Sequence, residues 1–440
     1  MVHAPMDEWE SREIEPRAKS SATYKWAVVG MLWFICFFNY ADRQAVYSVF
    51  PLLEEEFQFT KTEQGWIAAA FMWVYALTAP FAGQVGDRFS RKYVILAGLF
   101  VWSAVTGFTA ICSKVWQFVF VRGAEGLGET VYFPASMSLI SDYHGKSTRS
   151  RAMSFHQTSV YAGTIGGGWL AGWMGLHYGW RVSFVVLAVA GILLGLVLAA
   201  FIREPKRNQA ELEEAGHQPK PNEATETAPI GPFLWQFFTT PTAMLLIVAF
   251  IGANSVAAIF LSWMPTFLKE KYALDLASAG FGATFYLQTA SMVGAIAGGV
   301  MADWARQRMP GGRVCVQSLG LFLGAPFVFA CGYTTNLWLL AGAMTMMGLF
   351  KGIYDSNIWA SLYDVVIPSR RGTAVGIMNM IGWIGGGLGT TLVGVVVDRG
   401  VTMSEAISAT AVVYAATAML LLAAGLLFAP RDVIRVHGAA

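Results

Sequence analysis

Twelve apolar segments constrain this chain more than any other feature, because a helix needs about 20 apolar residues to cross a bilayer. Only 13% of the residues are charged and 55% are hydrophobic, whereas soluble domains carry about 25% charged residues. The sequence therefore predicts an all-α membrane protein with twelve transmembrane helices. The predicted spans are residues 26–49, 64–84, 93–111, 115–139, 153–175, 180–202, 242–267, 277–301, 314–333, 336–363, 373–396 and 403–428.

Basic residues are distributed unevenly between the loops. With the N-terminus inside, cytoplasmic segments hold 21 of the 30 Lys and Arg, outer loops hold six, and three lie within spans. Because an excess of Lys and Arg marks cytoplasmic loops, we expect a multi-pass protein of the inner (plasma) membrane with both termini in the cytoplasm. The segment that precedes the first span is polar and charged, so we expect no cleavable signal peptide there.

A long polar stretch, "REPKRNQAELEEAGHQPKPNEATETAPIGP", divides the spans into two groups of six. Its Glu, Pro and Lys content predicts a solvated linker rather than a packed element. The expected regions are a cytoplasmic N-terminal segment (1–25), a six-helix bundle (26–202), a cytoplasmic linker (203–241), a second six-helix bundle (242–428) and a cytoplasmic tail (429–440).

The two bundles resemble each other in sequence. The register shift that places Asp142 on Asp364 also places Arg149 on Arg371 without a gap, and it brings two glycine-rich runs together. We call this register the repeat shift. Duplicated six-helix bundles are typical of transporters whose substrate site lies at the repeat interface near the bilayer midplane.

Two motifs carry a family resemblance. "GQVGDRFSRK" lies between spans 2 and 3 and is echoed by "GVMADW" in the second half, and "RGAEGLG" lies in span 4. They resemble signatures of the major facilitator superfamily, which implies two pseudo-symmetric six-helix bundles. Charges at these helix ends can form networks that lock one face of the bundle. The gating candidates are Gly83, Asp87, Arg88, Arg91, Asp142, Arg149, Asp303, Asp364 and Arg371.

Seven charged residues lie well inside the predicted spans, more than three residues from either end. Each would cost about 2.5–3.5 kcal/mol if it were unpaired at the bilayer centre, so we expect most of them to face the bundle interior and to have partners. They are Asp42, Arg43, Arg122, Glu125, Glu129, Lys351 and Asp355.

The spacing of these charges predicts how they pair. Asp42 and Arg43 are adjacent, so they point about 100° apart on a helix and each needs another partner. We expect Arg43 and Arg122 to face the interior with Asp42 and Glu129 within reach, and Arg122 to pair with Glu129 when no ligand is bound.

Another pair of span charges has a different spacing. Lys351 and Asp355 are four residues apart on span 10, a spacing at which side chains meet on one helix face. The sequence leaves open whether they neutralise each other or contact substrate.

The pattern Asn39-Tyr40-x-Asp42-Arg43, with Arg122 and Glu129 on span 4, resembles the anion:cation symporter family, which includes bacterial sugar-acid/proton symporters and sialin. The resemblance implies that the carboxylates of Asp42 and Glu129 couple transport to protons and that the arginines bind the substrate carboxylate. Further expected substrate contacts, from this resemblance or from polar and aromatic positions in the spans, are Tyr40, Tyr47, Tyr75, His156, Gln157, Tyr161, Asn254, Gln288, Asn357, Asn379 and Trp383.

"GDRFSRKY" and "LISDYH" also resemble the spinster family, whose members move lysolipids and sphingoid compounds. The leading hypothesis is a proton-driven symporter of an organic carboxylate such as a hexonate or hexuronate, working by alternating access. The alternative is a proton-coupled exporter of amphiphiles.

Several other functions are not supported by the sequence. The glycine runs in the spans lack a Gly-Lys-Ser/Thr ending, and the scattered cysteines and histidines form no metal pattern. No basic cluster suggests nucleic acid, and no nucleophile–base set suggests an enzyme. We expect no cofactor or metal, only a proton gradient, and a bundle that functions as a monomer within the lipid bilayer.

Overall fold

The computed structural model describes residues 22–145, 148–205, 210, 230–367 and 370–437, except the side chains of Ala22, Gly83, Gly86, Asp87 and His437. The helices of the first half are α1 (Ala22–Phe57), α2 (Lys61–Arg88), α3 (Arg91–Thr109), α4 (Val115–Thr130), α5 (Tyr132–Tyr143), α6 (Arg149–Tyr178) and α7 (Trp180–Phe201). Those of the second half are α9 (Ile230–Thr239), α10 (Pro241–Tyr272), α11 (Leu276–Arg306), α12 (Gly312–Tyr333), α13 (Leu337–Asp355), α14 (Ile358–Asp364), α15 (Arg371–Asp398), α16 (Met403–Ala423), the π-helical turn η2 (Ala424–Phe428) and α17 (Ala429–His437).

Each predicted span coincides with a helix or with two consecutive helices, so the all-α class is confirmed. Nine helical segments in the described part of the chain are long and apolar enough to cross a membrane. The three predicted spans outside that group are α1, α4 with α5, and α6, which contain most of the buried charged and polar side chains of the first half.

Spans 4 and 10, which are equivalent in the two halves, are each broken. Span 4 divides into α4 and α5 at Val131, and span 10 divides into α13 and α14 at Ser356 and Asn357. Each break follows within two residues of the last charged side chain in its span, Glu129 or Asp355. The breaks therefore lie beside charged residues of the predicted spans, of which Glu129 is expected to work in transport.

The predicted linker, 203–241, is not uniformly a solvated segment. Its last part forms α9, whose Phe233 and Phe237 are buried against the core of the second half. The reason is local composition, because "IGPFLWQFFT" is apolar whereas the preceding residues are polar. The predicted tail likewise contains α17.

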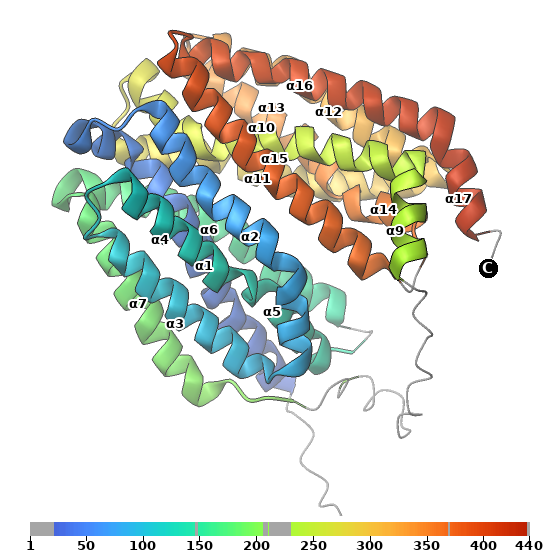
Figure 1. Ribbon diagram of the computed structural model, residues 1–440, viewed down its shortest axis with the longest axis horizontal. Coiled ribbons are helices and arrows are strands. Elements are labelled where there is room, and N and C mark those ends of the chain that lie inside the picture. Colours follow the sequence, from blue (N-terminus) through green and yellow to red (C-terminus); the bar gives the residue numbers. More distant parts are fainter. Residues whose placement is uncertain (1–21, 146–147, 206–209, 211–229, 368–369, 438–440) are drawn as a thin grey trace, which may run out of the picture.

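The halves lie side by side, the first coloured blue to green and the second yellow to red (Figure 1). We call the end that bears the start of α1 and the end of α7 the terminal face, and the end that bears the α1–α2 connection the distal face. α2 packs on α15, α6 packs on α11, and α1 packs on both α10 and α11, and these contacts join the halves.

Glycines allow the closest helix approaches. A Cβ on Gly163 or Gly167 of α6 would overlap the backbone of α1 at Phe37 or Ala41, so α1 and α6 touch backbone to backbone. Such small-residue contacts are typical of membrane helices, which lack a hydrophobic driving force for association.

We expect Gly167→Ala to lower the thermal unfolding temperature of the purified protein by several degrees, because overpacking costs about 1–3 kcal/mol. The matched control is Gly30→Ala on α1, where an added Cβ meets nothing within 4 Å. Equal melting temperatures for the two variants would contradict the close α1–α6 contact.

Candidate functional site

Five charged side chains from α1 and α4 are buried inside the first half, each at most 8% exposed. We call them the buried charge cluster. They are Asp42, Arg43, Arg122, Glu125 and Glu129.

The cluster contains two ion pairs. Arg43 Nε donates to Glu129 Oε2 and so joins α1 to α4, while Arg122 Nη1 donates to Glu125 Oε2 within α4. The expected pairing of Arg122 with Glu129 is wrong. Arg122 instead bonds the carboxylate one turn away on its own helix, which leaves Glu129 to neutralise Arg43.

Aromatic rings surround the two guanidinium groups. The Phe71 ring centroid lies 4.8 Å from the Cζ atoms of both Arg43 and Arg122, so one ring of α2 supports both cations. Tyr40 and Tyr75 lie 4.5 and 5.0 Å from Arg43. These distances suit cation–π attraction, which strengthens where water is excluded. Gly126 permits the geometry, because a Cβ there would press on the Phe71 carbonyl.

Several polar atoms of the cluster have no hydrogen-bond partner among the described residues. They include Arg43 Nη1, Arg122 Nε and Nη2, Glu129 Oε1 and both carboxylate oxygens of Asp42. Both side-chain polar atoms of Asn39 likewise have no hydrogen-bond partner among the described residues. Buried polar groups normally have partners, and each exception calls for an explanation. Here the exceptions gather around two arginines.

The cluster reaches the second half through aromatic side chains. Tyr75 and Phe71 lie 5.2 and 6.4 Å from Trp383 of α15, measured between ring centroids. The neighbouring Trp73 donates its Nε1–H to the Ile384 carbonyl at 3.2 Å. The predicted residues Tyr40, Tyr75 and Trp383 are therefore brought together with the arginines.

Other predicted contacts hold helices together. His156 Nε2 lies 2.9 Å from the Tyr132 hydroxyl, Asn254 donates to the Gly382 carbonyl at 2.7 Å, and Asn357 donates to the Gly298 carbonyl at 3.0 Å. These side chains are engaged in interhelical bonds, so the structure gives them a packing contact rather than an open ligand position.

The remaining predicted contacts are placed differently. Tyr47 also lies beside the arginines, with its ring centroid 5.8 Å from Arg122 Cζ. Gln288 is buried, whereas Gln157, Tyr161 and Asn379 are partly exposed. Lys351 pairs with Asp355 on α13, which realises the first of the two alternatives for that pair.

The terminal face of the first half carries a network around Arg91, which pairs with Asp142 and with Glu204, the latter at 2.9 Å. Glu204 also accepts the backbone N–H groups of Arg91 and Lys92 at 3.1 and 2.7 Å, so it caps the start of α3. Arg88 is exposed at the end of α2, and the side chains of Gly83 and Asp87 lie outside the described residues.

The second half contains an equivalent network, whose residues correspond to those of the first half under the repeat shift. Arg313 occupies the position of Arg91 and binds Asp364 at 3.2 Å, just as Arg91 binds Asp142. Arg149 and Arg371 both donate to a carbonyl eight residues earlier, at 3.3 and 3.1 Å. Asp303 binds Arg313 at 2.9 Å. Arg313 was not among the gating candidates, although the repeat shift applied to Arg91 identifies it.

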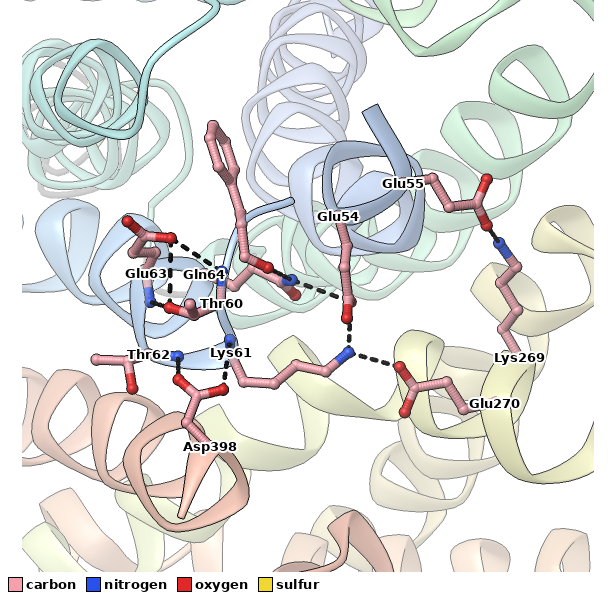
Figure 2. Close-up of polar contacts among 11 residues, drawn as sticks. Glu54, Glu55, Thr60, Lys61, Thr62, Glu63, Gln64, Lys269, Glu270 and Asp398 are labelled. Carbon is pink, nitrogen blue, oxygen red and sulfur yellow. Dashed lines mark hydrogen bonds and ion pairs between the residues drawn. The ribbon is translucent and has the colours of Figure 1, made fainter. Parts of the chain in front are cut away.

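A third network, which the sequence analysis also missed, joins the halves near the distal face (Figure 2). Lys61 Nζ lies 2.5 Å from Glu54 and 2.5 Å from Glu270 of the second half. Lys269 lies 2.5 Å from Glu55. Asp398 accepts the backbone N–H groups of Lys61 and Thr62 at 3.0 and 2.7 Å, so the end of α15 caps the start of α2. We call these six charged residues the distal network.

Comparison with known proteins identifies the family. The sequence profile of the Major Facilitator Superfamily matches residues 32–323. The chain belongs to this superfamily. Its class as a membrane transporter rather than an enzyme, expected from the sequence, is thereby confirmed.

Relatives fall in two groups. The chain is 25% identical to a probable galactarate/D-glucarate transporter of Bacillus subtilis, over 88% of each chain. It is 24% identical to a hexuronate transporter of Bacillus subtilis, over 87% of this chain and 90% of the relative. It is 28% identical to human protein spinster homolog 1, over 84% of this chain and 73% of the relative.

A solved structure shares the superfamily fold. It is a bacterial homologue of the human lysosomal transporter Spinster, inward-facing and unoccupied, with a TM-score of 0.77 and 21% identity over 94% of this chain and 98% of that chain. Both families that the motifs resemble are thus found among the relatives.

We expect Asp398→Ala to loosen the distal contact between the halves of this superfamily member. The readout is the labelling rate of Thr391→Cys, at the α2–α15 contact, by a membrane-impermeant maleimide added at the distal face. Because a helix cap contributes about 0.5–2 kcal/mol, the rate should rise about two- to thirtyfold. Glu405→Ala is the matched control, since Glu405 caps α16 within its own half. Equal rates in the two variants would rule out a closing role for Asp398.

We expect Glu204→Gln to lower the melting temperature by a few degrees at neutral pH. Burial raises the pKa of Glu204, but the bonds from Lys92, Arg91 and Ser90 favour the carboxylate and hold the pKa below its ordinary 4.5. The contribution of the Glu204 carboxylate to the free energy of unfolding is therefore complete above pH 4.5, and it is lost as the pH falls through the lowered pKa. Melting curves over this range should converge in acid, and a constant difference would contradict the prediction.

Proposed function

We propose that this transporter is a proton-coupled symporter of an organic carboxylate, most specifically a sugar acid, that works by alternating access. The observation that carries the proposal is the set of guanidinium nitrogens on Arg43 and Arg122 that have no hydrogen-bond partner in the described part of the chain, beside the Arg43–Glu129 ion pair. Buried arginines stay charged and bind carboxylates through paired N–H donors, which suits an anionic substrate.

We propose that proton coupling uses the pair of Arg43 and Glu129 rather than the expected pair of Arg122 and Glu129. Protonation of Glu129 removes the charge that neutralises Arg43 and frees its guanidinium for the substrate carboxylate. Conversely, an anion bound to Arg43 leaves Glu129 without its cation and favours its protonation. Proton and anion binding then support each other, and this reciprocity is a property of linked equilibria. Arg122 keeps Glu125 as its partner and offers Nε and Nη2 as further donors.

Asp42 is the second proposed proton carrier. It is 1% exposed, and neither of its oxygens has a hydrogen-bond partner among the described residues. An ionised carboxylate in such a position costs a large free energy, so a proton there is favoured.

Alternating access is supported by the positions of the contacts between the halves. The distal network joins them at one face, while the networks around Arg91 and Arg313 each lie within one half at the other. We propose that the distal face is the outer side, closed in this conformation, with the termini in the cytoplasm. No cofactor beyond the proton gradient is required, and one chain contains the whole cluster.

The relatives support a sugar acid as substrate, because galactarate, glucarate and hexuronates are all polyhydroxylated carboxylates. The second candidate is export of an amphiphile. It is favoured by the spinster relative and by an apolar groove of about 600 Å³ between α10, α15 and α16, lined by residues such as Ile251, Leu388 and Leu392. That groove contains none of the buried charge cluster, so it does not explain the arginines.

The test is transport into liposomes that contain a pH-sensitive dye, with hexonates, hexuronates and hexarates as substrates and a lysolipid as the amphiphile. We expect a sugar acid to acidify the interior. Glu129→Gln should abolish uptake driven by a pH gradient while it preserves counterflow exchange of the same substrate, because the anion site remains and the proton site is lost.

Glu125→Gln is the matched control, since Glu125 is equally buried one turn earlier on α4 but pairs with Arg122. Because it removes a negative charge beside Arg122, it should strengthen rather than weaken anion binding, and it should keep the response to the pH gradient. Gradient-driven uptake by Glu129→Gln would refute the coupling role. A response to the lysolipid alone would replace the symporter with the amphiphile exporter.

A further inference from the structure

Lys351 occupies in the second half the position that Glu129 occupies in the first. The repeat shift that relates Asp142 to Asp364 also relates Glu129 to Lys351. α4 begins at Val115 and α13 begins at Leu337. Glu129 and Lys351 lie at the same number of residues from the starts of their helices. Both helices start at the distal face, so at 1.5 Å per residue each side chain lies about 21 Å from that end.

Arg43 is at the same depth, because it precedes Phe57, where α1 ends at the distal face, by the same number of positions. The Arg43–Glu129 pair and Lys351 thus lie at one level on opposite halves. The pair of Lys351 and Asp355 lies near the first half, since Tyr161 of α6 is within electrostatic range of both side chains.

The partner of Lys351 is easily released. The ammonium group is paired with Asp355 one turn later on α13, and the Asp355 side chain is 43% exposed whereas that of Glu129 is fully buried. The Lys351 side chain is only 16% exposed, but the carboxylate of the pair is open. Breaking a pair whose anion stays solvated costs less than leaving a buried charge without a partner. Lys351 can therefore exchange Asp355 for a ligand carboxylate at low cost.

We propose that Lys351 binds a second carboxylate of the substrate, so that the preferred substrates are six-carbon sugar acids with a carboxylate at each end. This inference rests on the proposed function: Arg43 and Arg122 take one end of the chain and Lys351 takes the other. A ligand held in this way bridges the two halves, whereas a monocarboxylate reaches the cation of one half only.

The test compares a hexarate with the hexonate of the same sugar, galactarate against galactonate, by counterflow in liposomes. Lys351→Gln should weaken the apparent affinity for galactarate about tenfold or more, as expected for loss of a hydrogen bond to a charged group. Galactonate affinity should stay within about twofold. Lys351→Arg, which keeps the charge, should retain most of the preference.

Asp355→Asn frees Lys351 and should tighten galactarate binding without affecting galactonate binding. Misfolding cannot produce such an increase in affinity. Equal losses for both substrates in Lys351→Gln would overturn the inference and leave the pair as a structural contact within α13. Transport of galactonate but not galactarate by the unaltered protein would also overturn it while supporting the proposed function. Transport of no sugar acid at all would refute both.

Discussion

The ion pair between Arg43 and Glu129 is the interaction on which the first half depends. It joins α1 to α4 in the membrane interior, and both side chains are almost completely buried. Removing one partner of such a pair leaves an uncompensated charge, which costs about 3–5 kcal/mol, although the intact pair is a poor source of stability compared with apolar packing. The pair can therefore separate only if each charge is neutralised in another way. A proton can neutralise the Glu129 carboxylate, and a bound anion can neutralise the Arg43 guanidinium.

Close glycine contacts occur both within and between the halves. Inside the first half, α1 and α6 meet backbone to backbone at Gly163 and Gly167. Between the halves, a Cβ on Gly280 of α11 would overlap the backbone of α6, and a Cβ on Gly394 of α15 would overlap the backbone at the start of α2. These contacts lie toward the distal ends of the helices, on the same side as the ion pairs of the distal network. Glycine packing and ion pairs therefore close the distal face together, and both must separate in a rocking motion around a fixed site.

Much of this architecture could be predicted because it is encoded locally. Apolar length gives the spans, and the repeat shift gives the internal duplication that Asp142 and Asp364 confirm. The partner of Arg122 was predicted wrongly because both Glu125 and Glu129 lie on its helix face, and only the approach of α1 assigns Glu129 to Arg43. The distal network was missed because Asp398 and Lys61 are 337 residues apart, and no periodicity brings them together. α9 was missed because it is shorter than a span.

The charge of the buried cluster argues for coupling independently of any single pair. With Asp42 protonated, as its burial favours, two arginines and the carboxylates of Glu125 and Glu129 leave no net charge inside the first half, and Lys351 with Asp355 adds none. An anionic substrate that entered without a proton would leave one negative charge in a medium that solvates it poorly. One proton on Glu129 compensates for the first substrate carboxylate. A second carboxylate requires either a further proton or the outward turn of Asp355, which leaves the Lys351 ammonium group to neutralise it. One proton for each substrate molecule is therefore the least that keeps the interior neutral.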